Sequence, residues 1–262
     1  MAPNPVVFLL GAGASYPYGI PMMRGFYQEF RAHLVRRHPE ALPLVERFEE
    51  KVGRDDADLE TLLGHLQLVL GLPAGLEVLG AETRELDSQV QLARELQGYL
   101  DAFIVDRCQH FERERAFVEL QSLFRLCRHG PLWIFTTNYD LVIEYVCERA
   151  GTRLTDGFDA PTGSPLANWN GVFDGDVRLA KLHGSVNWFE DDPGGGLHRL
   201  DRGYALPTYE FRLTRGRQTL KPLMIIPTLQ KDALGRPYVQ LATQLWGALR
   251  QTRRHLINAA GG

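Results

Sequence analysis

A run of apolar residues that stops at glycine, close to the N-terminus, places the strongest limit on the fold. Residues 6–10, VVFLL, are followed directly by Gly11, Ala12 and Gly13. A short continuous apolar run ended by glycine is typical of a strand that is buried on both faces of a parallel sheet. Residues 132–135 and 223–226 form similar runs, and residues 177–182 alternate weakly. The sequence therefore predicts an α/β fold with a Rossmann-like parallel sheet that carries helices on both faces.

The stretch between the first two predicted strands is almost wholly helical in pattern. Residues 21–38 place apolar side chains at helical spacing, and several further stripes follow between residues 39 and 130. No strand pattern interrupts residues 39–130, so we expect a large all-helical insertion rather than a series of βαβ units. Residues 5–38 and 131–258 then form the core of a single domain over residues 1–262, whose last helix is predicted over 239–257.

Composition limits the class of protein. The chain has 262 residues and a formal net charge of -3, and this balance gives no electrostatic footprint for nucleic acid or an anionic membrane. The three cysteines lack the close pairs of a disulfide framework or a zinc ribbon, and no cluster has metal-ligand spacing. No segment is typical of a signal peptide or a membrane span. We therefore expect a cytoplasmic protein without a metal.

Unusual polar or glycine clusters follow three of the predicted strands. They are GAGAS at residues 11–15, TTNYD at 136–140 and LHGS at 182–185. In open α/β sheets, ligands bind in the crevice outside the carboxyl ends of the strands. We therefore expect these three loops to meet in one ligand-binding crevice.

The first loop suits a phosphate group. Gly11 and Gly13 permit positive φ and a close approach of a ligand to the backbone, and backbone N–H groups with the Ser15 hydroxyl can cradle phosphate oxygens. Alternatives stay open, since turns use glycine for steric reasons alone and Ser15 can be a plain helix cap. Arg24 either forms a surface ion pair or points toward a phosphate or ribose.

The other two loops carry candidate catalytic groups. Asn138 offers a donor and an acceptor, which suits a ribose hydroxyl or a positioned water. Asp140 either contacts the same ligand or caps the helix that starts near residue 141. His183 stands at a strand end beside Gly184, where a side chain with an unperturbed pKa of about 6.5 suits a general base.

The ordered set of motifs resembles the sirtuin superfamily. The matching residues are Gly11-Ala12-Gly13-Ala14-Ser15, Gly19-Ile20-Pro21 with Arg24, Thr136-Thr137-Asn138-Tyr139-Asp140 and Leu182-His183-Gly184-Ser185. KLHGSVNW at 181–188, IIPT at 225–228 and the long helical insertion are similar to the bacterial sirtuin-like domains of antiphage defence. The paired Cys-x-x-Cys zinc module of the protein deacylases is absent from the sequence.

The resemblance implies an NAD+ hydrolase that cleaves the nicotinamide–ribose bond, as the effector of an antiphage (abortive infection) system. It implies NAD+ as the substrate, no metal, and either a homo-oligomer or a partner of the Argonaute or ATPase type. Asn138 would hold the nicotinamide ribose or the attacking water, Asp140 would fix the loop or the ribose, and His183 would act as a base. The residues that the resemblance implies for binding NAD+ are Gly11, Ala12, Gly13, Ser15, Ile20, Arg24, Thr137, Gly184 and Ser185.

Other functions stay open as alternatives. An NAD-dependent protein deacylase is the weaker enzyme hypothesis because the zinc module is missing. A catalytically impaired module that binds NAD or ADP-ribose is the non-enzymatic alternative. A nicotinamide dehydrogenase ranks last, since Tyr16 stands where its G-x-G-x-x-G motif needs the third glycine.

The C-terminal end of the predicted sheet departs from the superfamily pattern. In the superfamily a further strand after the last helix contacts the adenosine half of NAD+, whereas this sequence stops at Gly262, where that strand should start. We therefore expect an incomplete sheet. It would belong to a piece of a longer protein, to a chain that a partner completes, or to a chain with compromised activity.

Overall fold

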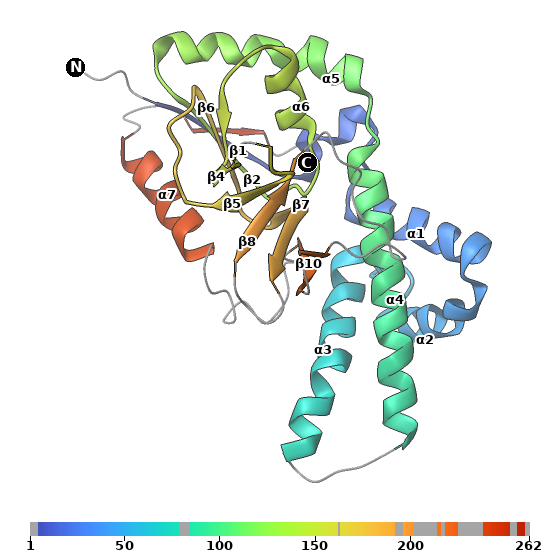
Figure 1. The fold of residues 1–262 in the computed structure, drawn as a ribbon. Helices are drawn as coiled ribbons and strands as arrows, with labels where there is room; N and C mark the ends of the chain where they lie inside the picture. Colours follow the sequence, from blue (N-terminus) through green and yellow to red (C-terminus); the bar gives the residue numbers. More distant parts are fainter. Residues whose placement is uncertain are drawn as a thin grey trace. The chain divides into compact units, whose positions relative to one another are not determined.

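The computed structural model describes residues 5–78, 84–161, 163–191, 196–201, 214–215, 218–224, 238–251 and 256–259. These residues divide into two compact units. The first contains the described parts of residues 1–20, 105–225 and 233–262, and the second contains the described parts of residues 21–104. Figure 1 draws the helices and strands of each unit.

The first unit is built on a parallel sheet, as the apolar runs predicted. Its strands follow the order β11-β1-β2-β6-β3, and every neighbouring pair is parallel. The bounds are β1 Val6–Leu10, β2 Leu132–Thr136, β3 Leu154–Thr155, β6 Val177–Lys181 and β11 Leu256–Ala259. Three of the predicted strands are thus neighbours in the middle of the sheet.

The structure contains a strand, β11, after the last helix, where we expected none. β11 pairs with β1 from Leu256, opposite Val7, to Ala259, opposite Leu10. The helix predicted over 239–257 ends earlier, since α7 spans Tyr238–Gln251. Residues 256 and 257 depart from the helical pattern because the edge of β1 offers backbone N–H and C=O groups that a strand can pair.

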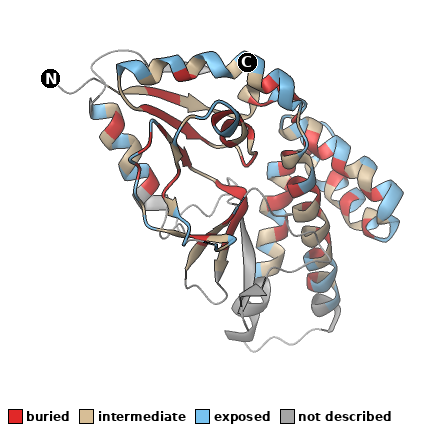
Figure 2. Ribbon diagram, turned by 45° about the horizontal axis from the view of Figure 1, so that its top comes forward, coloured by how far each residue is buried: buried red, intermediate tan, exposed pale blue. Residues whose placement is uncertain are grey.

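Helices cover both faces of this sheet, as predicted (Figure 1). Side chains alternate between the two faces along a strand, so Val7 packs in one core with Leu241 and Ala248 of α7. Phe8 lies on the opposite face, where it lines a cavity together with Val142 of α6, which spans Val142–Arg149. α5 (Arg113–Leu120) and the 3-10 helix η4 (Gln121–His129) also contribute to that cavity's wall. Figure 2 shows buried residues along the central strands.

A second sheet, which is antiparallel, is not apparent from the sequence pattern. Its order is β4-β5-β8-β7-β10-β9. The bounds are β4 Phe158–Asp159, β5 Leu166–Trp169, β7 Gly184–Asp191, β8 Leu197–Leu200, β9 Thr214–Arg215 and β10 Gln218–Met224. The prediction of a strand of the parallel sheet over 223–226 is therefore wrong in its bounds and in its sheet. Residues 223 and 224 end β10 in this antiparallel sheet, and residues 225 and 226 lie outside the described residues, as does the IIPT motif.

Aromatic side chains pack the second sheet against the first. Trp188 of β7 is buried in the same core as Trp133 and Phe135 of β2. The ring of Phe158, on β4, lies 4.9 Å from the ring of Trp188. Since β7 follows β6 after the turn at residues 182–183, the third loop connects the two sheets.

The second unit is helical throughout its described residues. It contains α1 Met23–Arg37, η3 Pro39–Ala41, α2 Leu42–Val52, α3 Leu59–Val78 and most of α4 Arg84–Gln109. Its core includes the fully buried Phe30, Leu34, Val45, Leu96 and Leu100. The unit differs from the insertion predicted over 39–130 at both ends, because α1 belongs to it and α5 and η4 belong to the first unit.

Neither a membrane-spanning helix nor a disulfide is present in the described part of the chain. None of its helices combines the length and the apolar character needed to cross a bilayer. The three cysteines are free thiols. Burial, with the nearby Asp140 carboxylate, raises the pKa of the Cys108 thiol, which disfavours the reactive thiolate.

Candidate functional site

The GAGAS segment leaves the carboxyl end of β1 as two short 3-10 helices. η1 spans Ala12–Ala14 and η2 spans Tyr16–Tyr18, and Gly19 follows with a φ of 88°. Gly11 is extended, with φ -108° and ψ -171°, and Gly13 lies inside η1. The positive φ that the sequence permits at Gly11 and Gly13 is therefore not used, and Gly19 is the glycine of this segment that adopts it.

Gly11 presents bare backbone to open space. A Cβ atom added there would meet nothing within 4 Å apart from its chain neighbours. Neither packing nor backbone conformation therefore requires glycine at this position. The open side of Gly11 leaves room for the close approach of a ligand, which is the second role that we expect for this glycine.

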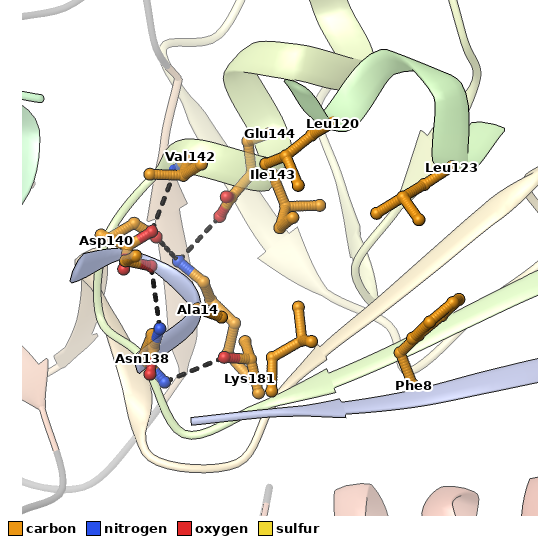
Figure 3. Close-up of a pocket in the computed structure, with 13 residues that line it drawn as sticks. Phe8, Ala14, Leu120, Leu123, Asn138, Asp140, Val142, Ile143, Glu144 and Lys181 are labelled. Atoms are coloured by element: carbon orange, nitrogen blue, oxygen red, sulfur yellow. Dashed lines mark hydrogen bonds and ion pairs between the residues drawn. The ribbon is translucent and has the colours of Figure 1, made fainter. Parts of the chain in front are cut away.

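Asn138 joins the second loop to the first. Its Nδ2 donates to the Gly11 carbonyl oxygen at 3.0 Å and to Ser15 Oγ at 2.9 Å, and Figure 3 shows it beside η1. Because a carbonyl oxygen can only accept, the contact with Gly11 fixes which atom of the amide is nitrogen. The two amide hydrogens serve these two bonds, so Oδ1 is the atom of Asn138 that can accept from a ligand.

Asp140 is buried beside this junction. Its Oδ1 accepts from the N–H of Val142 at 3.1 Å at the start of α6, and its carboxylate also accepts from the Ser15 hydroxyl. Burial raises the pKa of Asp140, while the ammonium of Lys181 and the two hydrogen bonds oppose that rise. The capping role that the sequence left open is therefore present, and the same carboxylate orients Ser15.

Four oxygen atoms surround the ammonium group of Lys181, the last residue of β6. Its Nζ donates to the carbonyl oxygens of Tyr139, at 3.3 Å, and of Asp140, and to Ser185 Oγ at 2.8 Å. It also forms an ion pair with Glu144 Oε1 on α6 at 2.8 Å. Lys181 is 2% exposed and Glu144 is 4% exposed. The buried cation thereby connects the second loop, the third loop and α6.

The third loop turns the chain from the parallel sheet into the antiparallel one. Leu182 and His183 form the turn between β6 and β7, and Gly184 follows with a φ of 82°. The N–H of Leu182 donates to the Thr136 carbonyl oxygen at 2.7 Å, which holds the turn beside the end of β2. His183 is half-buried, and it is not among the residues that line the cavity described below.

A cavity of about 240 Å³ lies beside the junction of the loops. Its polar wall, at the left in Figure 3, includes Asn138, Asp140, Glu144 and Lys181. Ser15 and Thr136 are also polar, and the remaining lining residues are apolar: Phe8, Leu10, Ala14, Leu120, Leu123, Val142 and Ile143. An apolar cavity with a few convergent polar groups is the usual form of a small-molecule site.

The remaining predicted residues of the first unit have mainly structural contacts. Ser185 is fully buried, and its hydroxyl donates to the Tyr139 carbonyl oxygen at 3.2 Å. The N–H of Thr137 donates to the Leu10 carbonyl oxygen at 3.1 Å. Ala12 is half-buried in η1, and Ile20 is buried. These contacts hold the loops together, as expected for loops that meet at one edge of the sheet.

Arg24 lies in the second unit, in the first turn of α1. Its guanidinium forms an ion pair with Asp55 at 3.2 Å. The two side chains are 61% and 97% exposed. The surface ion pair that the sequence left open as an alternative is therefore formed.

Lys181 was not selected from the sequence, although it contacts two of the three loops. The available signal was a charged side chain at the end of a strand that is otherwise buried. A buried ammonium needs hydrogen-bonding partners, and the adjacent LHGS motif supplies only one of them, the Ser185 hydroxyl. Which groups would supply them depends on the sheet order, because Tyr139 and Asp140 are 42 and 41 residues away in the sequence.

No group of three or more metal-ligating side chains occurs among the described residues. No protein-family model matches the chain, and no curated protein matches it either. The functional argument therefore depends on the geometry of the three loops and on the motifs that they carry.

Proposed function

We propose that this chain is a sirtuin-like NAD+ hydrolase, which cleaves the bond between nicotinamide and ribose to give nicotinamide and ADP-ribose. The observation that carries the proposal is the junction of Asn138 with Gly11 and Ser15 at the carboxyl ends of β1 and β2. This edge is where open α/β sheets bind ligands. Ser15 of the first motif and Asn138 and Asp140 of the second line the cavity at this edge.

The first loop supplies the binding surface for the diphosphate of NAD+. The open side of Gly11 lets a phosphate approach the backbone without a side chain in the way. Ser15 has a different task, because its hydroxyl accepts from Asn138 and donates to Asp140. Ser15 therefore orients Asn138 and Asp140 from its place in the cavity lining.

The second and third loops supply the chemistry. Nicotinamide leaves NAD+ through an oxocarbenium-like state, which needs positioning and stabilisation of positive charge. Asn138 Oδ1 accepts a hydrogen bond from a ribose hydroxyl or from the attacking water. Asp140, when ionised, favours the developing positive charge, and His183 takes the proton that water or a ribose hydroxyl gives up.

The test is release of nicotinamide from NAD+, followed by chromatography. The protein is assayed alone and with a candidate partner of the Argonaute or ATPase type, as the sirtuin-like resemblance suggests. Asn138→Ala and His183→Ala should each lower the rate by about 100-fold or more. The matched control is Asn170→Ala, since Asn170 is exposed and belongs to none of the three loops. Equal rates for the wild type and both site variants would sink the assignment.

Two other outcomes separate the alternatives. Release of nicotinamide that requires an acyl-lysine peptide would identify a deacylase instead. Calorimetry that detects binding of NAD+ or ADP-ribose, with no turnover alone or with any partner, would identify a binding module.

A further inference from the structure

We propose that Lys181 is a positioning residue, whose ammonium acts as a tethered cation that holds the catalytic loop in register with the GAGAS loop. The catalytic loop is defined here as residues 138–140. The cation site itself follows from the contacts of Lys181 alone, whereas its effect on catalysis rests on the proposed NAD+ hydrolysis.

The contacts of Lys181 differ from those of a simple ion pair. Of the four oxygen atoms that contact it, one belongs to a carboxylate, that of Glu144, and the Asp140 carboxylate also interacts with its charge. Two others are the backbone carbonyls of Tyr139 and Asp140, and the fourth is the hydroxyl of Ser185. Neutral carbonyl and hydroxyl oxygens around one buried positive charge form the kind of site that also suits a small free cation.

Two peptide planes of the catalytic loop are oriented by this cation. The carbonyl groups of Tyr139 and Asp140 both point at Nζ, so the peptide bonds that follow these two residues are fixed. Asn138 directly precedes them, and its amide reaches Gly11 and Ser15. Displacement of the two carbonyls would therefore move Asn138 Oδ1, the atom that the proposed function assigns to the substrate.

Stability alone gives a weak reason for a lysine at this position. Replacing a buried ion pair by apolar residues of similar volume is often neutral or stabilising. β6 already buries Val177, Leu179 and Ala180 next to Lys181, so an apolar residue would continue the pattern of the strand. The carbonyl contacts, which an apolar side chain cannot make, are what distinguish the lysine.

The experiment replaces the tethered cation by a free one. Lys181→Ala removes the side chain and leaves the oxygens, and Lys181→Met keeps the length without the charge. Each variant is studied in ammonium chloride, methylammonium chloride and tetramethylammonium chloride at equal ionic strength. Tetramethylammonium has no N–H donor and serves as the salt control. Lys51→Ala, which removes an exposed lysine of α2, is the control for loss of a positive charge.

The first readouts do not depend on activity. Ammonium and methylammonium should raise the thermal midpoint of Lys181→Ala in a saturable way, and should slow amide hydrogen exchange in a peptide covering residues 136–142. Neither effect should occur with tetramethylammonium, in Lys51→Ala or in Lys181→Met, whose side chain fills the space. If Lys181→Ala does not fold in water, recovery of the fold on refolding with methylammonium supports the site, and failure to recover overturns it.

The activity readout tests the positioning role. Lys181→Ala should lose about 100-fold in kcat, as expected for a small misplacement of a catalytic group, and methylammonium should restore part of it. A wild-type kcat in Lys181→Met, or amine-independent behaviour of Lys181→Ala in all assays, would overturn the proposal. A wild type that releases no nicotinamide would instead contradict the proposed function, while the thermal and exchange readouts would still decide the cation site.

Discussion

Asn138 Nδ2 lies 2.9 Å from Ser15 Oγ, which joins the ends of β1 and β2 through two side chains that are 123 residues apart in the sequence. The same amide reaches the Gly11 carbonyl, and Ser15 in turn donates to Asp140. The chain of bonds from Gly11 to Asp140 is directional, because each hydrogen has one donor and one acceptor. A substitution that exchanges one donor atom for an acceptor therefore tests whether these hydrogen bonds stabilise the junction.

Asn138→Asp should destabilise the protein although the two side chains have the same shape. An oxygen would replace Nδ2 opposite the Gly11 carbonyl oxygen, so two acceptors would face each other. We expect a loss of about 1–3 kcal/mol in the free energy of unfolding, measured by urea denaturation. In the control Asn170→Asp, the exposed Oδ1 that accepts from Val172 is retained, and the change should stay within about 0.5 kcal/mol. Similar losses in both variants would contradict this account of the junction.

Gly11→Ala should separate substrate binding from folding. The added methyl group meets no atom of the protein within 4 Å and the backbone is extended, so the free energy of unfolding should change by less than about 1 kcal/mol. The methyl group would occupy the space proposed for a phosphate of NAD+, so KM should rise at least about tenfold, which corresponds to 1.4 kcal/mol of binding.

The control for this prediction is Gly247→Ala on α7. Gly247 also has open space around it and lies on α7, outside the three loops. Because alanine favours a helix over glycine by up to about 1 kcal/mol, this variant should be slightly more stable with an unchanged KM. An unchanged KM in Gly11→Ala as well would argue that no phosphate approaches Gly11.

Ionisation of the Asp140 carboxyl group should lower the free energy of unfolding as the pH rises. Burial raises the pKa of Asp140 in the folded state, so the folded protein keeps a proton that the unfolded protein has released above about pH 4. The free energy of unfolding should therefore fall from this pH up to the raised pKa. Asp140→Asn keeps an oxygen for the N–H of Val142 and removes the titrating group, so its stability should fall less steeply with pH.

Urea denaturation at a series of pH values measures this slope. Asp159→Asn on β4 is the control, because Asp159 is exposed. Asp156 is a second buried aspartate whose pKa is raised by burial, so part of the slope should remain in Asp140→Asn. Identical pH profiles for Asp140→Asn and the wild type would exclude Asp140 as a source of the slope.

The parallel sheet was predictable because its strands are short apolar runs ended by polar clusters. The antiparallel sheet was not, since β7 begins at Gly184 and Ser185, which also belong to the loop motif, and its tryptophan contacts come from distant segments. β11 was not predicted from the sequence for a different reason. Leu256 lies seven residues after Leu249, which continues a helical spacing, and only the position of β1 makes these residues a strand.

The site was predictable to the extent that motifs mark strand ends. Asn138, Asp140 and Ser15 follow apolar runs, so the edge rule brought them together before their contacts were known. The side-chain network behind them was not predictable in this way. Whether Lys181 points into the protein or to solvent depends on which face of β6 is covered by the neighbouring elements and α6. The residues next to Lys181 in the sequence are compatible with either orientation.

The ion pair of Lys181 and Glu144 should behave as a coupled unit in a double-mutant cycle. Both side chains are at least 95% buried, so Lys181→Met or Glu144→Gln leaves a charge without its partner and should cost about 3–5 kcal/mol. The double variant removes both charges and should cost clearly less than the sum of the two. The control cycle uses the ion pair of Arg153 and Asp174, whose nitrogen and oxygen atoms are 2.8 Å apart and whose side chains are 62% and 57% exposed. Its coupling energy should be below about 1 kcal/mol. Additive losses for Lys181 and Glu144 would mean that the carbonyl contacts, and not the ion pair, account for the stability that Lys181 provides.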